Sequence, residues 1–238
     1  MLAFSSLLGN VEGQNIYRIW YDKPASYWEE ALPVGNGRIA AMVFGDPQLE
    51  QIQLNEETVS AGSPYQNYNE EAKTALPEMR RLIFEGKYEE AQNMAATKIL
   101  SQVGNEMPYQ TVGRLNIRYQ DHKKVNNYYR DLDISNAVAV TRYEVDGVEF
   151  TEETFASFTD QLVIRHIKAS KPGTINCELF FNTPMRDPKR SIYGKKGLRL
   201  EGITHGSRYF PGKVHYCADL DVKHKGGKVI TANDTLLS

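Results

Sequence analysis

The chain of 238 residues has an ordinary globular composition, with 41% hydrophobic and 24% charged residues, and is long enough to bury a sizeable core. Its formal net charge of −2 gives no global positive field, which argues against nucleic acid as a partner. No apolar run is long enough to span a bilayer, so the sequence predicts no membrane span.

The first fifteen residues form a segment of their own. Met1–Leu8 is a short apolar stretch, and a polar segment follows it to Asn15. The stretch is similar to the tail of a secretory signal whose basic start is missing, and a frayed N-terminal arm is an equal alternative. We expect residues 1–15 to be a signal-like or disordered arm outside the folded domain.

Most of the remaining chain has the alternating pattern of strands. Ile39–Phe44 and Glu50–Leu54 flank a Gly-Asp-Pro break and predict a hairpin. A second hairpin is predicted over 138–150, because Asp146-Gly147 supplies the two positive-φ residues of a type I′ turn. Further strands are predicted at 115–119, 161–168, 175–181, 214–222 and 228–232, with turns at 171–173 and 226–227. Frequent turns without alternating helices predict an all-β fold, an antiparallel β-sandwich.

One segment interrupts the strands. Between Asn69 and Leu100, apolar residues recur at helical spacing on both sides of Gly86. We expect an inserted helical hairpin whose apolar stripe lies on a sheet, with Pro77 kinking or shortening the first helix. The sequence has no internal repeat and no low-complexity linker, which favours one folded domain over residues 16–238.

The last residues follow a strand-like segment directly. Leu236 and Leu237 form an apolar pair that needs a partner, and Ser238 ends the sequence. We therefore expect a sandwich that is incomplete at its C-terminal end. An unpaired strand edge with uncovered apolar surface favours self-association.

Cysteine and histidine spacing points to no cofactor. Alternation places Cys177 on an apolar face and Cys217 on a polar face, which disfavours a disulfide. The five histidines lack the spacing of a zinc site, so we expect no metal. Gly35–Ala40 matches the dinucleotide fingerprint, but a strand follows where a helix is required, so a turn is the better interpretation.

Aromatic residues are crowded near the start of the domain. Tyr17, Trp20, Tyr21, Tyr27 and Trp28 lie within a dozen residues. Stacked rings can form a platform for sugars, but large aromatic residues beside a first strand more often fill the core. We favour a core role and keep Trp20 and Trp28 as a candidate aromatic platform.

Several separate motifs carry a resemblance to a known family. They are Trp20–Ala25, Trp28–Arg38, Ala41–Gly45, Gln53–Thr58, Tyr109–Gln110, Val112–Gly113, Tyr129–Asp133, Phe155–Ser157 and Asp160–Gln161, in that order. With these segments the chain resembles the N-terminal part of glycoside hydrolase family 95 proteins, from about Tyr17 to its last residue. Several motifs in sequence are far more specific than any one of them alone.

That family is known for α-L-fucosidases, some members act on L-galactosides, and hydrolysis inverts the anomeric centre. The resemblance implies an N-terminal β-sandwich of the supersandwich type, followed by a helical linker, an (α/α)6 barrel and a C-terminal β domain. The acid, the base and the assisting asparagines come from the barrel, so no catalytic residue is carried onto this chain. The implied partners are that barrel and, through it, fucosylated glycans. With the signal-like start, the resemblance also implies a bacterial protein that is secreted or periplasmic.

The matching motifs supply candidate site residues in the sandwich. They are Asn36, Arg38, Asn55 and Glu56. We expect them to face the barrel or to shape its mouth, and a role in tying turns together fits them equally well. Ala40 and Ser60 depart from the family, which commonly has glycine and tryptophan there, and the missing tryptophan weakens the expectation of a sugar contact.

Inverting hydrolysis needs two carboxyl groups roughly 6.5–9.5 Å apart. Three pairs of adjacent acids occur, Glu29–Glu30, Glu56–Glu57 and Glu152–Glu153, and we expect them on the surface because strand neighbours point to opposite faces. The chain is therefore predicted not to hydrolyse sugars alone. Two alternatives are a free-standing carbohydrate-binding module that uses the Trp20/Trp28 region and an interaction domain that docks onto a separate catalytic chain.

Overall fold

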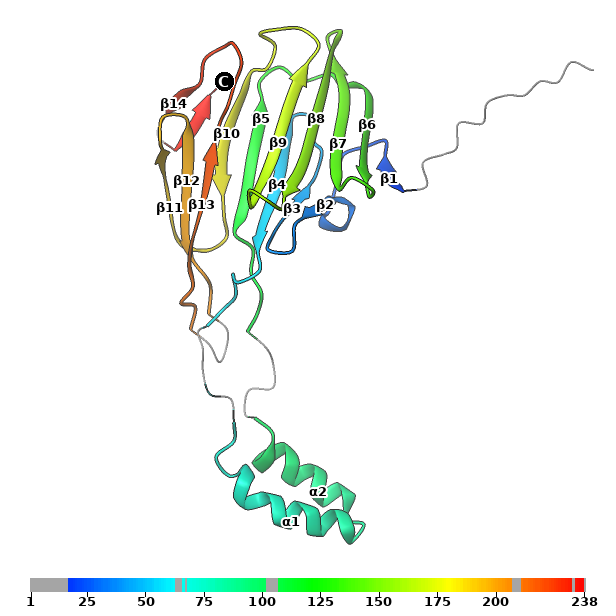
Figure 1. Cartoon of the computed structure of the whole chain (residues 1–238), viewed down its shortest axis with the longest axis vertical. Helices are drawn as coiled ribbons and strands as arrows, with labels where there is room; N and C mark the ends of the chain where they lie inside the picture. The colour runs from blue at the N-terminus through cyan, green and yellow to red at the C-terminus, as the bar shows by residue number, and fades with distance from the viewer. Residues whose placement is uncertain are drawn as a thin grey trace, which may run out of the picture.

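A computed structural model of the chain describes residues 17–62, 66, 68–101, 107–206, 211–232 and 234–237. The described strands form three antiparallel sheets, and Figure 1 shows them stacked as a sandwich. This confirms the predicted all-β class. The N-terminal arm predicted for residues 1–15 lies outside the described residues.

One layer of the sandwich is a seven-stranded sheet in the order β14-β15-β10-β5-β4-β3-β2. Its strands, in chain order, are β2 (Leu32–Gly35), β3 (Ile39–Val43), β4 (Leu49–Glu56), β5 (Gly113–Tyr119), β10 (Cys177–Asn182), β14 (Ile230–Ala232) and β15 (Thr235–Leu237). A 3-10 turn, η1 (Trp28–Glu30), leads into β2.

The other layer consists of two smaller sheets. The five-stranded sheet, in the order β1-β6-β7-β8-β9, is made of β1 (Arg18–Tyr21), β6 (Asn126–Asp133), β7 (Val138–Val145), β8 (Val148–Ser157) and β9 (Leu162–Ala169). The three-stranded sheet is made of β11 (Arg186–Tyr193), β12 (Gly197–Ile203) and β13 (His215–Asp221).

Apolar side chains that alternate along the strands fill the space between the layers. Ile52 and Ile117 come from the seven-stranded sheet, Ala139 from the five-stranded sheet and Leu198 from the three-stranded sheet, and each is at most 1% exposed. Burying one isoleucine or leucine side chain contributes about 1.5–3 kcal/mol. Both smaller sheets therefore share one core with the seven-stranded sheet.

The two hairpins predicted from local turn chemistry are confirmed. In the β7–β8 turn, Asp146 and Gly147 both have positive φ angles, 49° and 71°. In the loop between β3 and β4, Gly45 has φ 76°, and a Cβ there would lie 2.8 Å from the Cδ of Arg130. Only glycine fits at that close approach.

The predicted turns at 171–173 and 226–227 also lie between strands, but each joins strands of different sheets. β9 pairs only with β8 among the described strands, whereas β10 pairs with β5 and β15. β13 belongs to the three-stranded sheet and β14 to the seven-stranded sheet. These turns are therefore crossings between the layers.

The inserted helical hairpin is present, and its predicted packing is wrong. It consists of α1 (Ala72–Phe84), which runs unbroken through Pro77, and α2 (Tyr88–Met94), continued by the π-helical turn η2 (Ala95–Ile99). Its apolar side chains Ala75, Leu82 and Ala91 are buried where the two helices meet. Figure 1 shows the pair standing beyond one end of the sandwich, so its stripe covers a partner helix and no sheet. None of the described helices could cross a membrane.

One residue of the apolar pair near the C-terminus, Leu236, has a partner, contrary to expectation. Leu236 is 0% exposed, because β15 pairs with both β10 and β14 and the side chain enters the core. Leu237 is 37% exposed. The cysteines behave as predicted, since Cys177 is buried, Cys217 is exposed and both are free thiols.

Candidate functional site

Three of the four polar candidates meet at one end of the sandwich, which we call the polar end and define by Asn36, Arg38, Glu56 and Gln161. It lies where β2 turns into β3, where β4 ends and where β8 turns into β9. Figure 1 shows the helical hairpin beyond this same end. Segments far apart in the sequence thus place polar groups side by side.

Asn36 connects the two layers. Its Oδ1 accepts hydrogen bonds from the backbone amides of Arg38 and Ile39, at 3.1 and 2.9 Å, and so fixes the β2–β3 turn. Its Nδ2 donates to the carbonyl of Ser157, at 2.8 Å, at the end of β8 in the opposite sheet. The Asn36 amide therefore helps to hold both the turn and the two layers together.

Arg38 presents its charge at the surface of the polar end. Its Nε donates to Oε1 of Gln161 at 2.9 Å, and one terminal nitrogen lies 3.4 Å from Oε1 of Glu56. The other oxygen of Glu56 accepts hydrogen bonds from the backbone and the hydroxyl of Thr58. The side chain of Arg38 is 50% exposed, so this guanidinium is held in place and still reaches solvent.

Asn55 is not brought into this cluster. It pairs with Ala40 across β3 and β4, and its side chain makes no hydrogen bond to any described residue. Tyr109 pairs with Ser60 a few residues beyond β4, and partial burial, with the nearby charges of Glu56 and Glu57, raises its pKa. Gln161 and Tyr109 both stand in the motifs that carry the family resemblance, and that is the signal by which the sequence could have indicated them.

The aromatic residues near the start of the domain are mostly exposed, so the expected core role is wrong for them. Trp20 is 61% and Trp28 48% exposed. Trp20 projects from the edge strand β1 and stacks on Tyr129 of β6, with ring centroids 6.2 Å apart. Asp131, directly opposite Trp20, is buried and forms ion pairs with Arg18 and Arg142. No contact joins Trp20 to Trp28 among the described residues, so they form separate sites.

Two carboxylates do converge, but inside the core. Glu50 of β4 and Glu152 of β8 are 0% and 1% exposed, and both contact the same terminal nitrogen of Arg165 on β9. The Arg165–Glu50 distance is 2.6 Å. Two carboxylates thus share one guanidinium between the layers.

Hydrogen bonds surround this buried cluster. Tyr119 and Tyr143 donate to Oε1 of Glu152 at 2.7 and 2.6 Å, and the amide of Gly45 donates to Oε1 of Glu50 at 2.8 Å. Burial raises the pKa of Glu50 to about 7, against the opposing effect of Arg165. The cluster therefore carries a proton close to neutral pH.

The buried acids correct an expectation and limit the chemistry of the sandwich. Glu152 and Glu30, each a member of an adjacent acid pair, are buried, so their predicted surface position is wrong. A sugar cannot reach a carboxylate that is 0–1% exposed, so Glu50 and Glu152 do not form a hydrolytic pair. No group of three metal-binding side chains occurs among the described residues.

The layered antiparallel sheets, with a cluster of buried acids between them and polar turns at one end, define a β-sandwich domain. Residues 19–238 match the family described as "Glycosyl hydrolase family 65, N-terminal domain". The chain belongs to this family.

Curated relatives agree with this assignment. The chain is 37% identical over 181 residues to "Alpha-L-fucosidase 2" of Arabidopsis thaliana, covering 74% of this chain and 21% of that protein. It is 26% and 25% identical to two proteins named "Probable alpha-fucosidase A", from Aspergillus niger and Aspergillus oryzae, covering 64% and 83% of this chain and 20% and 28% of theirs. The chain thus spans a fifth to just over a quarter of these relatives. The predicted resemblance to the N-terminal domain of α-L-fucosidases is confirmed.

Proposed function

We propose that this chain is the N-terminal domain of a glycoside hydrolase resembling the inverting α-L-fucosidases of family 95, and that it supports a catalytic (α/α)6 barrel. One observation carries the proposal: an N-terminal family domain fills residues 19–238 and accounts for about a fifth of a relative named for α-L-fucosidase activity. The substrates of the complete enzyme are then fucosylated glycans. We further propose a secreted or periplasmic location for it.

The polar end is the surface that we assign to the barrel. The half-exposed Arg38 is oriented by Gln161 and Glu56 before any partner arrives, so little side-chain freedom is lost on docking. Asn36 holds the turn that carries Arg38. We propose that this end contacts the barrel and shapes the entrance to its substrate pocket.

A chimera with the plant relative tests this proposal. Deleting the segment of Arabidopsis alpha-L-fucosidase 2 that aligns with this chain is expected to abolish its fucosidase activity. Inserting the present chain in its place is expected to restore activity, and Arg38→Ala in the chimera to lower it about tenfold, as expected for a lost charged contact at an interface.

The control for Arg38→Ala is Arg199→Ala, which removes an exposed ion pair with Asp219 on β12 and β13, away from the polar end. It is expected to leave the activity of the chimera unchanged. Full activity of the deleted relative without any N-terminal segment would contradict the supporting role.

A second candidate function is a free-standing carbohydrate-binding module. It is favoured by the exposed ring of Trp20, stacked beside Tyr129 on the outer face of the five-stranded sheet. Titration of the chain with a fucosylated oligosaccharide, followed by tryptophan fluorescence, separates the two functions. A saturable change that Trp20→Ala removes supports the module.

We also propose that exposed strand edges such as β13 promote self-association.

A further inference from the structure

The outer face of the seven-stranded sheet carries an ordered array of planar side chains. Period-two alternation directs them outward from three adjacent strands, and the register aligns them in rows. The array consists of Gln51 and Gln53 on β4, Arg114, Asn116 and Arg118 on β5, and Glu178, Phe180 and Asn182 on β10. Amides, guanidinium groups and a carboxylate thus surround an aromatic ring.

Contacts within the array hold these groups flat on the sheet. Arg114 donates to Oε1 of Gln51 at 2.6 Å and lies over the ring of Phe44, at 5.5 Å. Arg118 pairs with Glu178 at 2.5 Å and lies over the ring of Phe180, at 4.8 Å. Long side chains on a solvated sheet face are usually mobile, and fixing them in advance lowers the entropic cost of binding a ligand.

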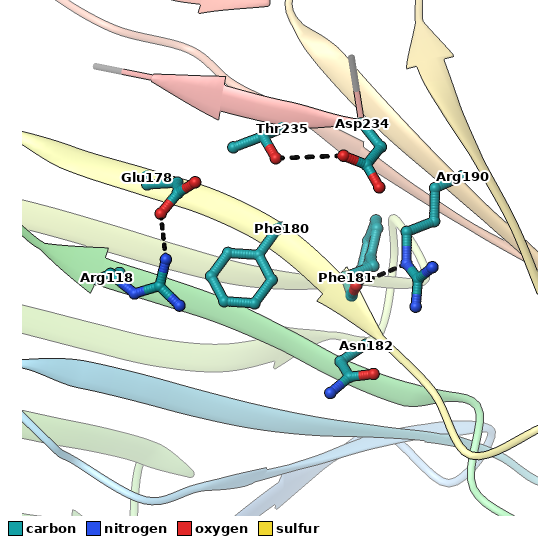
Figure 2. Close-up of a pocket in the computed structure, with 8 residues that line it drawn as sticks. All are labelled: Arg118, Glu178, Phe180, Phe181, Asn182, Arg190, Asp234 and Thr235. Atoms are coloured by element: carbon teal, nitrogen blue, oxygen red, sulfur yellow. Dashed lines mark hydrogen bonds and ion pairs between the residues drawn. The ribbon is translucent and has the colours of Figure 1, made fainter. Parts of the chain in front are cut away.

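A depression of about 280 Å³ opens beside Phe180. Figure 2 shows the residues that line it. Arg190 reaches it from β11, and its Nε donates to the backbone carbonyl of Phe181 at 2.8 Å. No described residue accepts a hydrogen bond from the terminal nitrogens of Arg190 or bonds the side-chain amide of Asn182. Unpaired polar groups therefore lie beside a half-buried aromatic ring, one face of which Arg118 covers.

The charges around the depression balance. Arg118 and Arg190 face Glu178 and Asp234, so its lining carries no net charge. That balance disfavours an anion and suits a neutral ligand. The volume lies just below the range of about 300–1,000 Å³ of sites for drug-sized ligands, which fits a ligand of a single ring.

We propose that this depression binds one neutral sugar residue, whose C–H face stacks on Phe180 while its hydroxyl groups bond to Arg190, Asn182 and Asp234. A sugar ring has an apolar face and a rim of hydroxyl groups, and it requires both kinds of contact at once. Gln51, Gln53 and Arg114 of the array extend this surface and can contact neighbouring residues of a glycan chain, whereas Asn116 is buried and bonds the backbone.

This inference goes beyond the proposed function and does not rest on it. The depression lies on the outer face of the sheet, whereas the polar end lies at the turns, and the aromatic platform of Trp20 belongs to the other sheet. The inference concerns binding of a sugar alone.

Amide-resolved NMR titration of the chain tests the site. Methyl α-L-fucoside and methyl β-D-galactoside are the probes, with glycerol as a polyol that lacks a ring and inorganic phosphate as an anion. We expect saturable shifts at residues 178–182 and 234–236 with one of the sugars, at a Kd of about 1–10 mM, as is usual for a small ligand on an open site. Glycerol and phosphate are expected to leave these signals unchanged.

Two alanine variants identify the binding ring. Phe180→Ala is expected to weaken binding about tenfold, whereas Phe84→Ala, which removes an exposed ring from α1, is expected to leave the Kd unchanged. Arg190→Gln provides a second test that leaves the core intact, and at least a threefold loss is expected from the missing hydrogen bonds. Three results would overturn the assignment. They are saturation by phosphate alone, sugar-induced shifts that are lost only in Trp20→Ala, and no shift with either sugar. None of these results bears on the outcome of the chimera experiment. The sugar site and the proposed supporting function can therefore be refuted independently.

Discussion

Replacing Arg165 by leucine is expected to destabilise the domain by about 3–5 kcal/mol. The guanidinium is the partner of two carboxylates that are almost completely buried, Glu50 and Glu152, and removing it leaves charge in the core without compensation. Chemical denaturation at pH 8, followed by circular dichroism, measures the loss. The denaturant concentration at which half of the protein is unfolded is expected to fall, while the slope of the unfolding free energy against denaturant concentration stays unchanged.

Arg199→Leu is the matched control for this substitution. Arg199 forms a two-pronged ion pair with Asp219, with both contacts at 2.6 Å, but both side chains are near 30–36% exposed. Exposed ion pairs contribute about 0–1 kcal/mol. If Arg165→Leu lowers the free energy of unfolding by no more than Arg199→Leu does, the buried cluster does not stabilise the sandwich.

Replacing Glu50 by glutamine is expected to remove much of the pH dependence of stability. Burial raises the pKa of Glu50 from 4.5 to about 7 in the folded state, so the folded chain binds a proton that the unfolded chain has released. Stability from this group is fully present below pH 4.5 and is lost as the pH rises to 7. The free energy of unfolding is therefore expected to fall by about 2–3 kcal/mol between pH 5 and pH 8.

Comparison of the wild type with Glu50→Gln isolates this effect from other titrating groups. The variant has no proton to lose at this position. Its unfolding free energy minus that of the wild type is therefore expected to rise by about 2–3 kcal/mol between pH 5 and pH 8. Glu149→Gln is the control, because Glu149 also lies on β8 but is exposed, and its side chain forms no ion pair with a described residue. An equal pH dependence in wild type and Glu50→Gln would contradict protonation of the cluster.

Features of the fold that depend on local chemistry could be predicted from the sequence. The Asp146-Gly147 turn requires two positive φ angles, and this sequence pair adopts them readily. Likewise, the alternation of Leu115 and Ile117 places both in the core of β5. In such elements the residues nearest in the chain determine the structure.

Features that depend on partners far along the chain could not be predicted. Glu50 and Arg165 are separated by 115 residues. The sequence around either residue does not indicate that the other lies beside it with the opposite charge. The burial of Glu152 follows from the same distant contact. The helical stripe of Ala75 and Leu82 was equally consistent with packing on a sheet and packing on another helix, and the structure contains the second.

The candidate site was predicted in part. The motifs that contain Asn36, Arg38 and Glu56 indicated polar turns, and these residues do meet at one end of the sandwich. Asn55 is one position from Glu56, yet it stays apart because strand neighbours point to opposite faces. Trp20 was expected in the core because its side chain is large, but the edge strand β1 leaves it exposed.

The proposed function rests on our proposal that the sugar-cleaving groups of the enzyme are not carried by this chain. Incubation of the pure chain with p-nitrophenyl α-L-fucoside, followed by release of p-nitrophenol, tests it most directly. No release above the buffer blank is expected between pH 4 and pH 8, because Glu50 and Glu152 are sealed in the core. Turnover that persists through purification and is lost in Glu50→Gln or in Glu178→Gln would contradict the claim and assign catalysis to the sandwich itself.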